Sequence, residues 1–227
     1  MSHKINIIYF IWINPNRNWR VIIDGQLFDM KISGIFESSR LYIVISCENN
    51  NIINEAIDLI NNSLNDIYKN KYNIITTNYN NYEYYGIKKL YDISLLEPDK
   101  LYIYLHSKGM LNWYNNNLNK RSEDEENLTR NTIYLWRDII DVFEKNQNIN
   151  KIGFIPSQDG WIWFNFFWTR GTYLITCENP IITDNRYYYE SWLNSGDKNN
   201  GISYSIYSHD YRTYSAHEAI DIITNLR

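Results

Sequence analysis

The sequence is poor in cysteine and has no long apolar run. Its two cysteines, Cys47 and Cys177, lie far apart in strand-like apolar stretches, which favours two buried thiols in a reducing compartment. No segment reaches the roughly 18 apolar residues of a membrane span. The short apolar run from Ile7 to Ile13 lacks a small-residue cleavage site and predicts a first core strand, not a signal peptide. We therefore expect no transmembrane segment and a cytoplasmic location.

A basic stripe and the common catalytic motifs are also missing. The formal net charge is −4, and the lysines and arginines are scattered. A protein that binds duplex nucleic acid needs clustered positive charge, so we expect no nucleic acid polymer as a partner. The sequence contains no Walker loop, Gly-rich dinucleotide fingerprint, HExxH, CxxC or GxSxG motif. These absences argue against P-loop nucleotide hydrolysis, NAD chemistry, zinc proteases and α/β-hydrolases.

The chain has an ordinary globular composition with alternating strands and helices. Its 227 residues are 44% hydrophobic and 21% charged, which fits a single domain. Apolar runs predict strands at residues 5–13, 41–47, 72–77 and 101–105. Apolar residues at helical spacing predict helices over 19–33, 52–67 and 83–91. This order predicts an α/β fold, a parallel sheet with helices on both faces.

The second half is less regular. Ser122 and Glu125 have capping-box spacing, which predicts a helix to about Lys145. The acidic run at 123–126 is interpreted as a solvated helix start in preference to a metal site. Further elements are expected as strands at 152–155 and 172–177 and a helix at 184–193. In the first half, Gly25 in the middle of the first helix is unfavourable, whereas Gly34 supplies its end.

The strand "LYIYL" at 101–105 runs directly into a polar cluster, His106 to Gly109. In parallel sheets, ligands bind outside the carboxyl ends of the strands, where this cluster is expected to lie. Lys108 next to Gly109 could bring an ammonium and backbone N–H groups to a diphosphate, and His106 could donate to the same oxygens. The alternative is a strand end that meets water.

Two later stretches could also contribute to a site. "FNFFWTRGTYL" at 164–174 sets Asn165 among aromatics and follows them with Arg170, which suits a sugar or a base; the alternative is core packing. In "RYYYESWL" at 186–193, Glu190 could act as a general base. The alternative is an i,i+4 ion pair between Arg186 and Glu190.

In this order, five stretches resemble a glycosyltransferase family of giant viruses and bacterial polysaccharide clusters. The stretches are "NWRVIIDGQLFDMKISGIF", "LYIYLHSKG", "LWRDII", "FNFFWTRGTYL" and "RYYYESWL". The chain is also similar to the N-terminal glycosyltransferase domain of a large chlorovirus protein. The resemblance implies a GT-A fold, with a Rossmann-like nucleotide-binding half at about 1–110 and an acceptor half at about 111–227 around one mixed, mostly parallel sheet.

The resemblance also implies an activity and roles for residues. The expected reaction moves a sugar from a UDP- or GDP-linked donor to a hydroxyl of a glycan or glycoprotein, with Glu190 as the catalytic base of an inverting transfer. The implied donor-binding residues are His106, Ser107, Lys108, Gly109, Asn165, Arg170, Trp12, Asn14 and Trp19. The implied acceptor-binding residues are Trp168, Arg186 and Trp192. A viral protein of this kind would act in the host cytoplasm or the virion.

The sequence departs from the family pattern at one point. Many GT-A enzymes hold a divalent metal with Asp-x-Asp after the fourth strand, where this chain has His106-Ser107-Lys108. Two alternatives follow: a Mn²⁺ or Mg²⁺ ion held by other residues, or Lys108 supplying the positive charge. A further alternative to the enzyme is a catalytically silent module that binds carbohydrate or nucleotide sugar with the same fold.

Overall fold

The computed structural model describes residues 3–64, 68, 70–107, 120–197 and 201–226. These residues form one seven-stranded sheet in the order β3-β2-β1-β4-β6-β5-β7. The strands are β1 (Ile5–Trp12), β2 (Ser39–Ser46), β3 (Tyr72–Thr77), β4 (Leu101–His106), β5 (Ile149–Gly153), β6 (Phe167–Arg170) and β7 (Ile202–Ser205). The pairs from β3 to β4 are parallel, β6 is antiparallel to both β4 and β5, and β7 is parallel to β5. The fold is therefore α/β with a mixed, mostly parallel sheet, as predicted.

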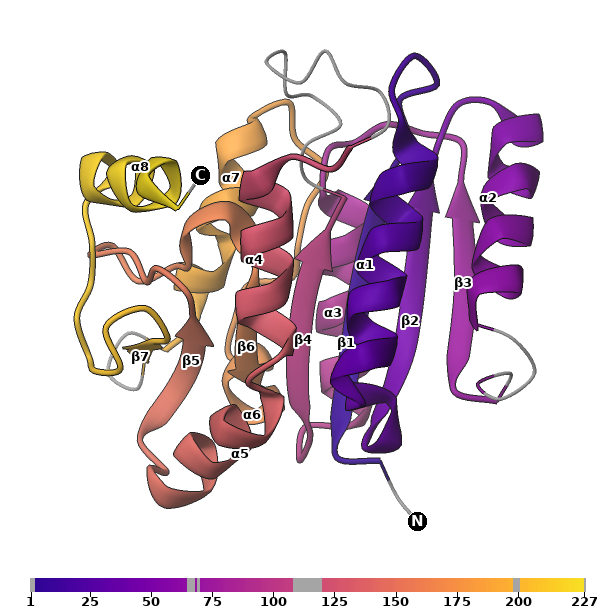
Figure 1. Cartoon of the computed structure of the whole chain (residues 1–227). Helices are drawn as coiled ribbons and strands as arrows, with labels where there is room; N and C mark the ends of the chain where they lie inside the picture. The colour runs from indigo at the N-terminus through magenta and orange to yellow at the C-terminus, as the bar shows by residue number, and fades with distance from the viewer. Residues whose placement is uncertain (1–2, 65–67, 69, 108–119, 198–200, 227) are drawn as a thin grey trace.

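Helices cover both faces of this sheet (Figure 1). One core lies between the sheet and α1 (Trp19–Ser33), α2 (Asn50–Leu64), α4 (Glu123–Ile133), α5 (Trp136–Lys145) and α8 (Ala216–Asn225). A second core lies on the other face, under α3 (Tyr84–Leu96), α6 (Gly171–Leu174) and the short helix η4 (Trp192–Ser195), which follows α7 (Arg186–Ser191). Two further short helices are η1 (Ile35–Glu37) and η3 (Trp163–Asn165).

Strand β4 supplies side chains to both cores by simple alternation. Ile103 and Leu105 pack into the core under α1, whereas Tyr102 and Tyr104 pack into the core under α3. Because successive strand residues point to opposite faces, His106 continues the α3 side. This alternation places the imidazole at the carboxyl end of β4, on the α3 side of the sheet.

Most expected elements of the first half are confirmed. Helix α1 spans Trp19–Ser33 and ends at Gly34, whose backbone has φ 72° and whose N–H donates to the carbonyl of Lys31. This left-handed conformation is the one that glycine adopts without a steric penalty at a helix end. Strand β3 has the predicted bounds, and α3 is longer than expected, reaching Leu96.

The second half corrects two predictions. The expected helix over 122–145 is two helices, α4 and α5, with a break at Tyr134 and Leu135. The expected strand over 172–177 instead begins with helix α6. Its buried residues, Gly171, Tyr173, Leu174 and Cys177, follow helical spacing, although the β-branched and aromatic composition resembles a strand. Strand β6 lies just before it, within the aromatic block.

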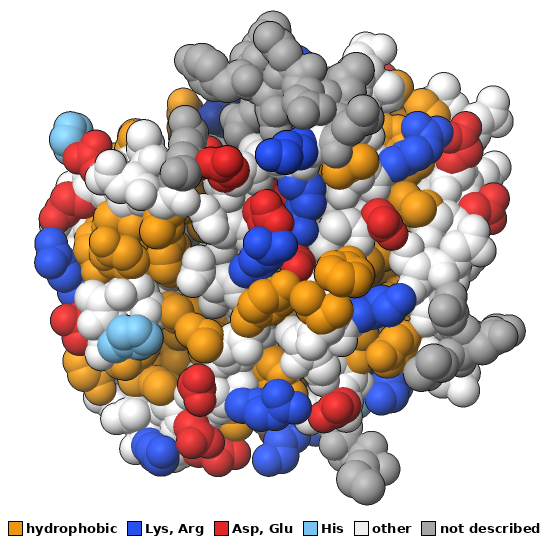
Figure 2. Space-filling model, viewed as in Figure 1, with side chains coloured by type: hydrophobic (Ala, Val, Ile, Leu, Met, Phe, Trp, Pro, Cys, Tyr) orange, Lys and Arg blue, Asp and Glu red, His pale blue; other side chains and the backbone are white. Residues whose placement is uncertain are grey.

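Charged side chains of both signs are interspersed on the face shown in Figure 2. Among the described residues on that face, no continuous basic stripe is seen. Within the described part of the chain, no helix is both long enough and apolar enough to cross a membrane.

Candidate functional site at the carboxyl edge of the sheet

The carboxyl ends of β1 and β4 lie side by side at the centre of the sheet. From β1 the strand order runs outward to β2 and β3 on one side and to β4 on the other. Such a reversal of strand order is where open α/β sheets bind their ligands. Trp12 and Asn14 mark this edge at the end of β1, and His106 and Ser107 mark it at the end of β4.

Ser107 joins these two strand ends. Its Oγ accepts a hydrogen bond from the N–H of Trp12 and donates one to the carbonyl of Trp12, both at 3.1 Å. Its own N–H donates to the carbonyl of Phe10 at 2.9 Å. The hydroxyl of Ser107 thus helps to join β4 to β1, which gives this residue a structural role at the edge. Its expected contact with a nucleotide sugar stays a prediction.

His106 is held from both faces of the sheet. Its Nε2 lies 3.0 Å from the carbonyl oxygen of Phe164, which can only accept, so Nε2 carries the proton. Its own carbonyl accepts from Nε2 of Gln26, on α1, at 3.1 Å. Its ring also contacts the ring of Phe166, with 5.0 Å between ring centroids. The imidazole is therefore oriented before any ligand arrives.

A polar cluster lies next to His106 on the α3 side. We call the side chains of Glu83, Tyr104, His106 and Asn165, with the carbonyls of Phe164 and Tyr189, the carboxyl-edge cluster. Oε2 of Glu83 accepts from the hydroxyl of Tyr104 and from Nδ2 of Asn165, each at 3.0 Å. The same Nδ2 donates to the carbonyl of Tyr189, on α7, at 3.1 Å. The cluster therefore links β4, the start of α3 and α7.

Burial keeps the Tyr104 hydroxyl a donor. The pKa of Tyr104 is raised well above its ordinary value, first because the ring is fully buried and then because of the negative charge of Glu83. Both effects disfavour the phenolate, so the proton stays on the oxygen that donates to Glu83.

Backbone strain is concentrated at the same place. Among the described residues, four other than glycine have a positive φ, and three of them are Tyr82 (51°), Phe164 (70°) and Asn165 (55°). Tyr82 precedes Glu83, Phe164 provides the carbonyl for His106, and Asn165 provides the amide for Glu83. Left-handed backbone costs a bulky residue about 1–3 kcal/mol and tends to cluster at functional sites.

Glu190 lies in α7, one residue after the carbonyl that Asn165 holds. Its side chain is half-buried and makes no hydrogen bond or ion pair with the residues that the structure describes. The alternative interpretation of Glu190 as the ion-pair partner of Arg186 is wrong, because these two described side chains form no ion pair. The guanidinium of Arg186 lies over the ring of Tyr187, 4.9 Å from its centroid.

Three residues expected at the site have structural roles elsewhere. Arg170 pairs with Leu101 at the opposite end of β4, and its guanidinium donates to the carbonyls of Ile149 and Phe143. Trp168 is completely buried, and its Nε1 donates to the carbonyl of Thr132 at 2.7 Å. Trp192 is also buried, with Nε1 on the carbonyl of Glu178. The structure thus corrects the expected roles of these three side chains, because each is hydrogen-bonded inside the protein and Arg170 lies at the end of β4 opposite the edge.

The segment after β1 contributes fewer side chains than expected. Asn14 is half-buried at the edge, and its Oδ1 accepts from the N–H of Asn16 at 3.0 Å, which shapes the turn. Trp19 is buried in the core under α1, with the guanidinium of Arg20 above its ring. Of the predicted residues here, Trp12 and Asn14 therefore remain candidates at the edge, and Trp19 packs in the core.

Lys108 and Gly109, both expected to bind the diphosphate, lie outside the described residues. Among the residues that are described, no group of three or more His, Cys, Asp or Glu side chains is arranged to hold a metal ion.

Sequence reasoning missed Glu83 and Tyr104. Tyr104 is two residues before His106 in the strand, so alternation could have placed both on one face. Glu83 carried no such signal, because its partner Asn165 is 82 residues away in the chain. Family models and curated proteins were both compared with the chain, and none of them matches it.

Proposed function

We propose that the chain is a GT-A type glycosyltransferase that moves a sugar from a UDP- or GDP-linked donor to a hydroxyl of a glycan or glycoprotein. The observation that carries the proposal is the half-buried carboxylate of Glu190, which has no partner among the described residues and follows Tyr189, whose carbonyl belongs to the strained carboxyl-edge cluster. The layout of the sheet is compatible with it, since β1 to β4 come from the first half of the chain and β5 to β7 from the second.

In the proposed reaction, Glu190 accepts the proton of the acceptor hydroxyl as its oxygen attacks the anomeric carbon of the donor sugar. The bond from that carbon to the diphosphate breaks on the opposite face, and the nucleoside diphosphate leaves with the electron pair. The result is inversion at the anomeric carbon. The leaving group develops negative charge, and His106 and Lys108, which follow each other closely in the sequence at the end of β4, are proposed to stabilise that charge.

Replacing Glu190 with Gln tests the base. We expect turnover to fall by about 10²–10⁴-fold, the usual contribution of general acid–base catalysis, while affinity for the donor is retained. Turnover is measured as nucleotide release from UDP- and GDP-sugars, and donor affinity by calorimetry. The matched control is Glu178→Gln, an exposed glutamate in the segment before α7, which should leave both unchanged. Full turnover by Glu190→Gln would remove Glu190 from the mechanism.

A panel of nucleotide sugars tests the function as a whole. Donors that bind the folded protein should raise its unfolding temperature by mass action. The same panel with and without Mn²⁺ or Mg²⁺ separates a metal-assisted donor site from one in which Lys108 neutralises the diphosphate. Binding without turnover in any arm would favour the catalytically silent module over the enzyme.

A further inference from the structure

The carboxylate of Glu83 is held rigidly by one of its two oxygens. Oε2 accepts from Tyr104 and from Asn165, whose side chains are buried in the protein. Oε1 makes no hydrogen bond with the described residues, and the Glu83 residue itself is half-buried. A carboxylate fixed in this way presents its second oxygen in a defined direction without losing side-chain freedom on binding.

A second oxygen in the same unit is also without a partner. Nδ2 of Asn165 donates to Glu83 and to the carbonyl of Tyr189, and because both partners are acceptors the orientation of the amide is determined. Oδ1 of Asn165 is then a buried acceptor with no hydrogen bond to the described residues, and Asn165 is only 1% exposed. Buried acceptors without partners are rare and need an explanation.

Oε1 of Glu83 defines the chemistry of the group that would bind here. It belongs to a carboxylate, so a phosphate at this point would be repelled, and a hydroxyl, which can donate a hydrogen bond, would be bound. A sugar ring carries several hydroxyl donors. Tyr82 adjoins Glu83 in the chain, and Phe164 and Asn165 belong to the carboxyl-edge cluster, so the backbone strain fits a site whose geometry is prepared in advance.

We propose that Glu83 binds a hydroxyl of a sugar ring at the carboxyl edge of the sheet, either on the transferred sugar or on the ribose of the nucleotide. The proposal rests on the proposed function and adds the residue that recognises the sugar. Glu83 is distinct from Glu190, which takes the acceptor proton, and it does not contact the diphosphate.

Glu83→Gln tests this role because the amide keeps the shape of the side chain. Its oxygen can still accept from Tyr104 and Asn165, so the fold is retained, but its NH₂ now faces the ligand in place of a charged acceptor. The affinities of the wild type and the variant for UDP, GDP, UDP-glucose and GDP-mannose are measured by calorimetry. We expect affinity to fall by about tenfold or more, as for loss of a hydrogen bond to a charged group.

The four ligands separate the possible sources of the hydroxyl. If Glu83→Gln loses affinity only for the nucleotide sugars, Glu83 binds the transferred sugar. If it loses affinity equally for UDP and GDP, Glu83 binds the ribose. Unchanged affinity for every ligand that the wild type binds would overturn the role of Glu83 and leave the proposed function intact. No binding of any of the four by the wild type would instead contradict the proposed function, and this inference would fall with it.

Two further variants serve as controls. Glu144→Gln, an exposed glutamate on α5 that pairs only with the exposed Lys4, should bind every ligand as the wild type does. Glu83→Asp keeps the charge but withdraws the carboxylate by one methylene. If Glu83→Gln does not fold, as judged by thermal unfolding, Glu83→Asp is expected to show the same loss, and wild-type affinity in it would refute the proposal.

Discussion

Lys151 lies in the core and forms no ion pair with a carboxylate of the described residues. It is 1% exposed in β5, and its Nζ donates to the carbonyl of Gly160 at 2.5 Å and to the hydroxyl of Tyr173 at 3.2 Å. Burial lowers the pKa of Lys151 from 10.5 to about 8, because desolvation disfavours the ammonium. Burial has the opposite effect on the neighbouring thiol of Cys177, because it raises the pKa of this thiol to about 12. Both cysteines are buried and free, as predicted, and a thiol of such high pKa is a poor nucleophile.

The lowered pKa of Lys151 predicts a pH dependence of stability. Between pH 8 and 10.5 the unfolded chain binds more protons at this residue than the folded one, so folding becomes more favourable as the pH rises. The whole shift corresponds to about 3 kcal/mol, at 1.36 kcal/mol for each pH unit. In urea unfolding, the free energy of unfolding of the wild type should therefore increase relative to that of Lys151→Met as the pH rises from 8 to 10.5.

The exposed Lys145 provides the control for that measurement. Its side chain is 74% exposed at the end of α5, so Lys145→Met should follow the wild type at every pH. Parallel pH curves for the wild type and Lys151→Met would show that Lys151 keeps an ordinary pKa in the folded protein.

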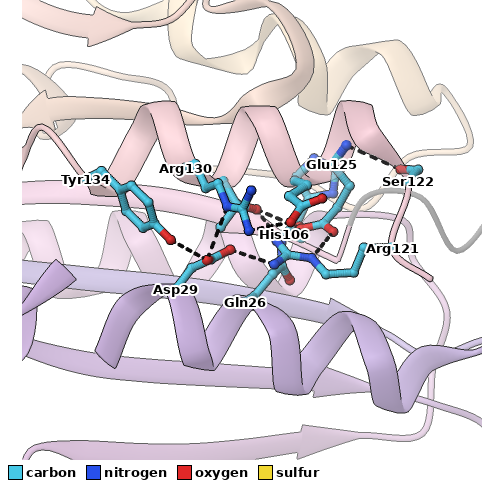
Figure 3. Close-up of polar contacts among 10 residues, drawn as sticks. Gln26, Asp29, His106, Arg121, Ser122, Glu125, Arg130 and Tyr134 are labelled. Carbon is cyan, nitrogen blue, oxygen red and sulfur yellow. Dashed lines mark hydrogen bonds and ion pairs between the residues drawn. The ribbon is translucent and has the colours of Figure 1, made fainter. Parts of the chain in front are cut away.

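Helices α1 and α4 are joined by a buried ion network, shown in Figure 3. Arg121 donates to Oδ2 of Asp29 at 2.6 Å and to both oxygens of Glu125 at 2.6 and 2.7 Å. Both carboxylates are completely buried. Tyr134 also donates to Asp29, at 2.6 Å, so the network extends to the end of α4.

This network corrects one prediction and explains another observation. The prediction of a solvated helix start at 123–126 is wrong for Glu125, which is buried and accepts hydrogen bonds from Arg121. Gly25, unfavourable in the middle of α1, lies against the side chain of Arg121, and a Cβ there would collide with it. The network also reaches the candidate site, because Gln26 donates both to Thr129, which bonds Glu125, and to the carbonyl of His106.

Removing the central cation should destabilise the protein strongly. Arg121→Met leaves two buried carboxylates without their main partner, which typically costs about 3–5 kcal/mol. Burial already raises the pKa of Glu125 and Arg121 opposes that effect, so in the variant the pKa should rise further. A raised folded pKa favours the folded state as the pH falls, and the loss measured by urea unfolding should be smaller at pH 5 than at pH 7.

Arg130 is the matched control for Arg121. It lies 3.4 Å from Asp29, but its side chain is 44% exposed. Arg130→Met should cost at most about 1 kcal/mol, as surface ion pairs do. An equal loss in the two variants would contradict the special role of the buried cation.

At the scale of the whole molecule, one sheet crosses both halves of the chain. Strand β4 of the first half pairs with β6 of the second from Leu101 opposite Arg170 to Tyr104 opposite Phe167. The hydrophobic core under α1 likewise contains residues from β1 and from β5. The halves therefore share hydrogen bonds and buried surface, and neither has a separate core.

This continuity predicts that the two halves unfold together. In urea, far-UV circular dichroism and tryptophan fluorescence should give coincident transitions, because secondary structure and the tryptophans of both halves are lost in one cooperative step. Amides of β1 and β6 should show similar protection from hydrogen exchange. A plateau between two transitions would mean that the halves are separate folding units.

The sequence predicted the features that depend on residues close together in the chain and missed those that depend on residues far apart. Strands β1 and β3 and helix α1 were predicted because their apolar residues repeat at strand or helix spacing within a short window. Helix α6 was missed because four residues are too few for a period and its residues favour strands. Glu83 was missed because its partners come from β4 and η3, and no local pattern encodes such a meeting.

The sequence by itself determined the alternation of strands and helices, and with it the location of His106 at the carboxyl end of a central strand. Hydrophobic burial has a period that can be read locally, so these features need no knowledge of the rest of the chain. Only the tertiary structure decided which polar groups meet at that edge. In the folded protein Asn165 donates to Glu83, Ser107 bonds the end of β1, and Arg170 and Trp168 lie outside the carboxyl-edge cluster. The order of the strands in the sheet determines which of these groups are close enough to bond.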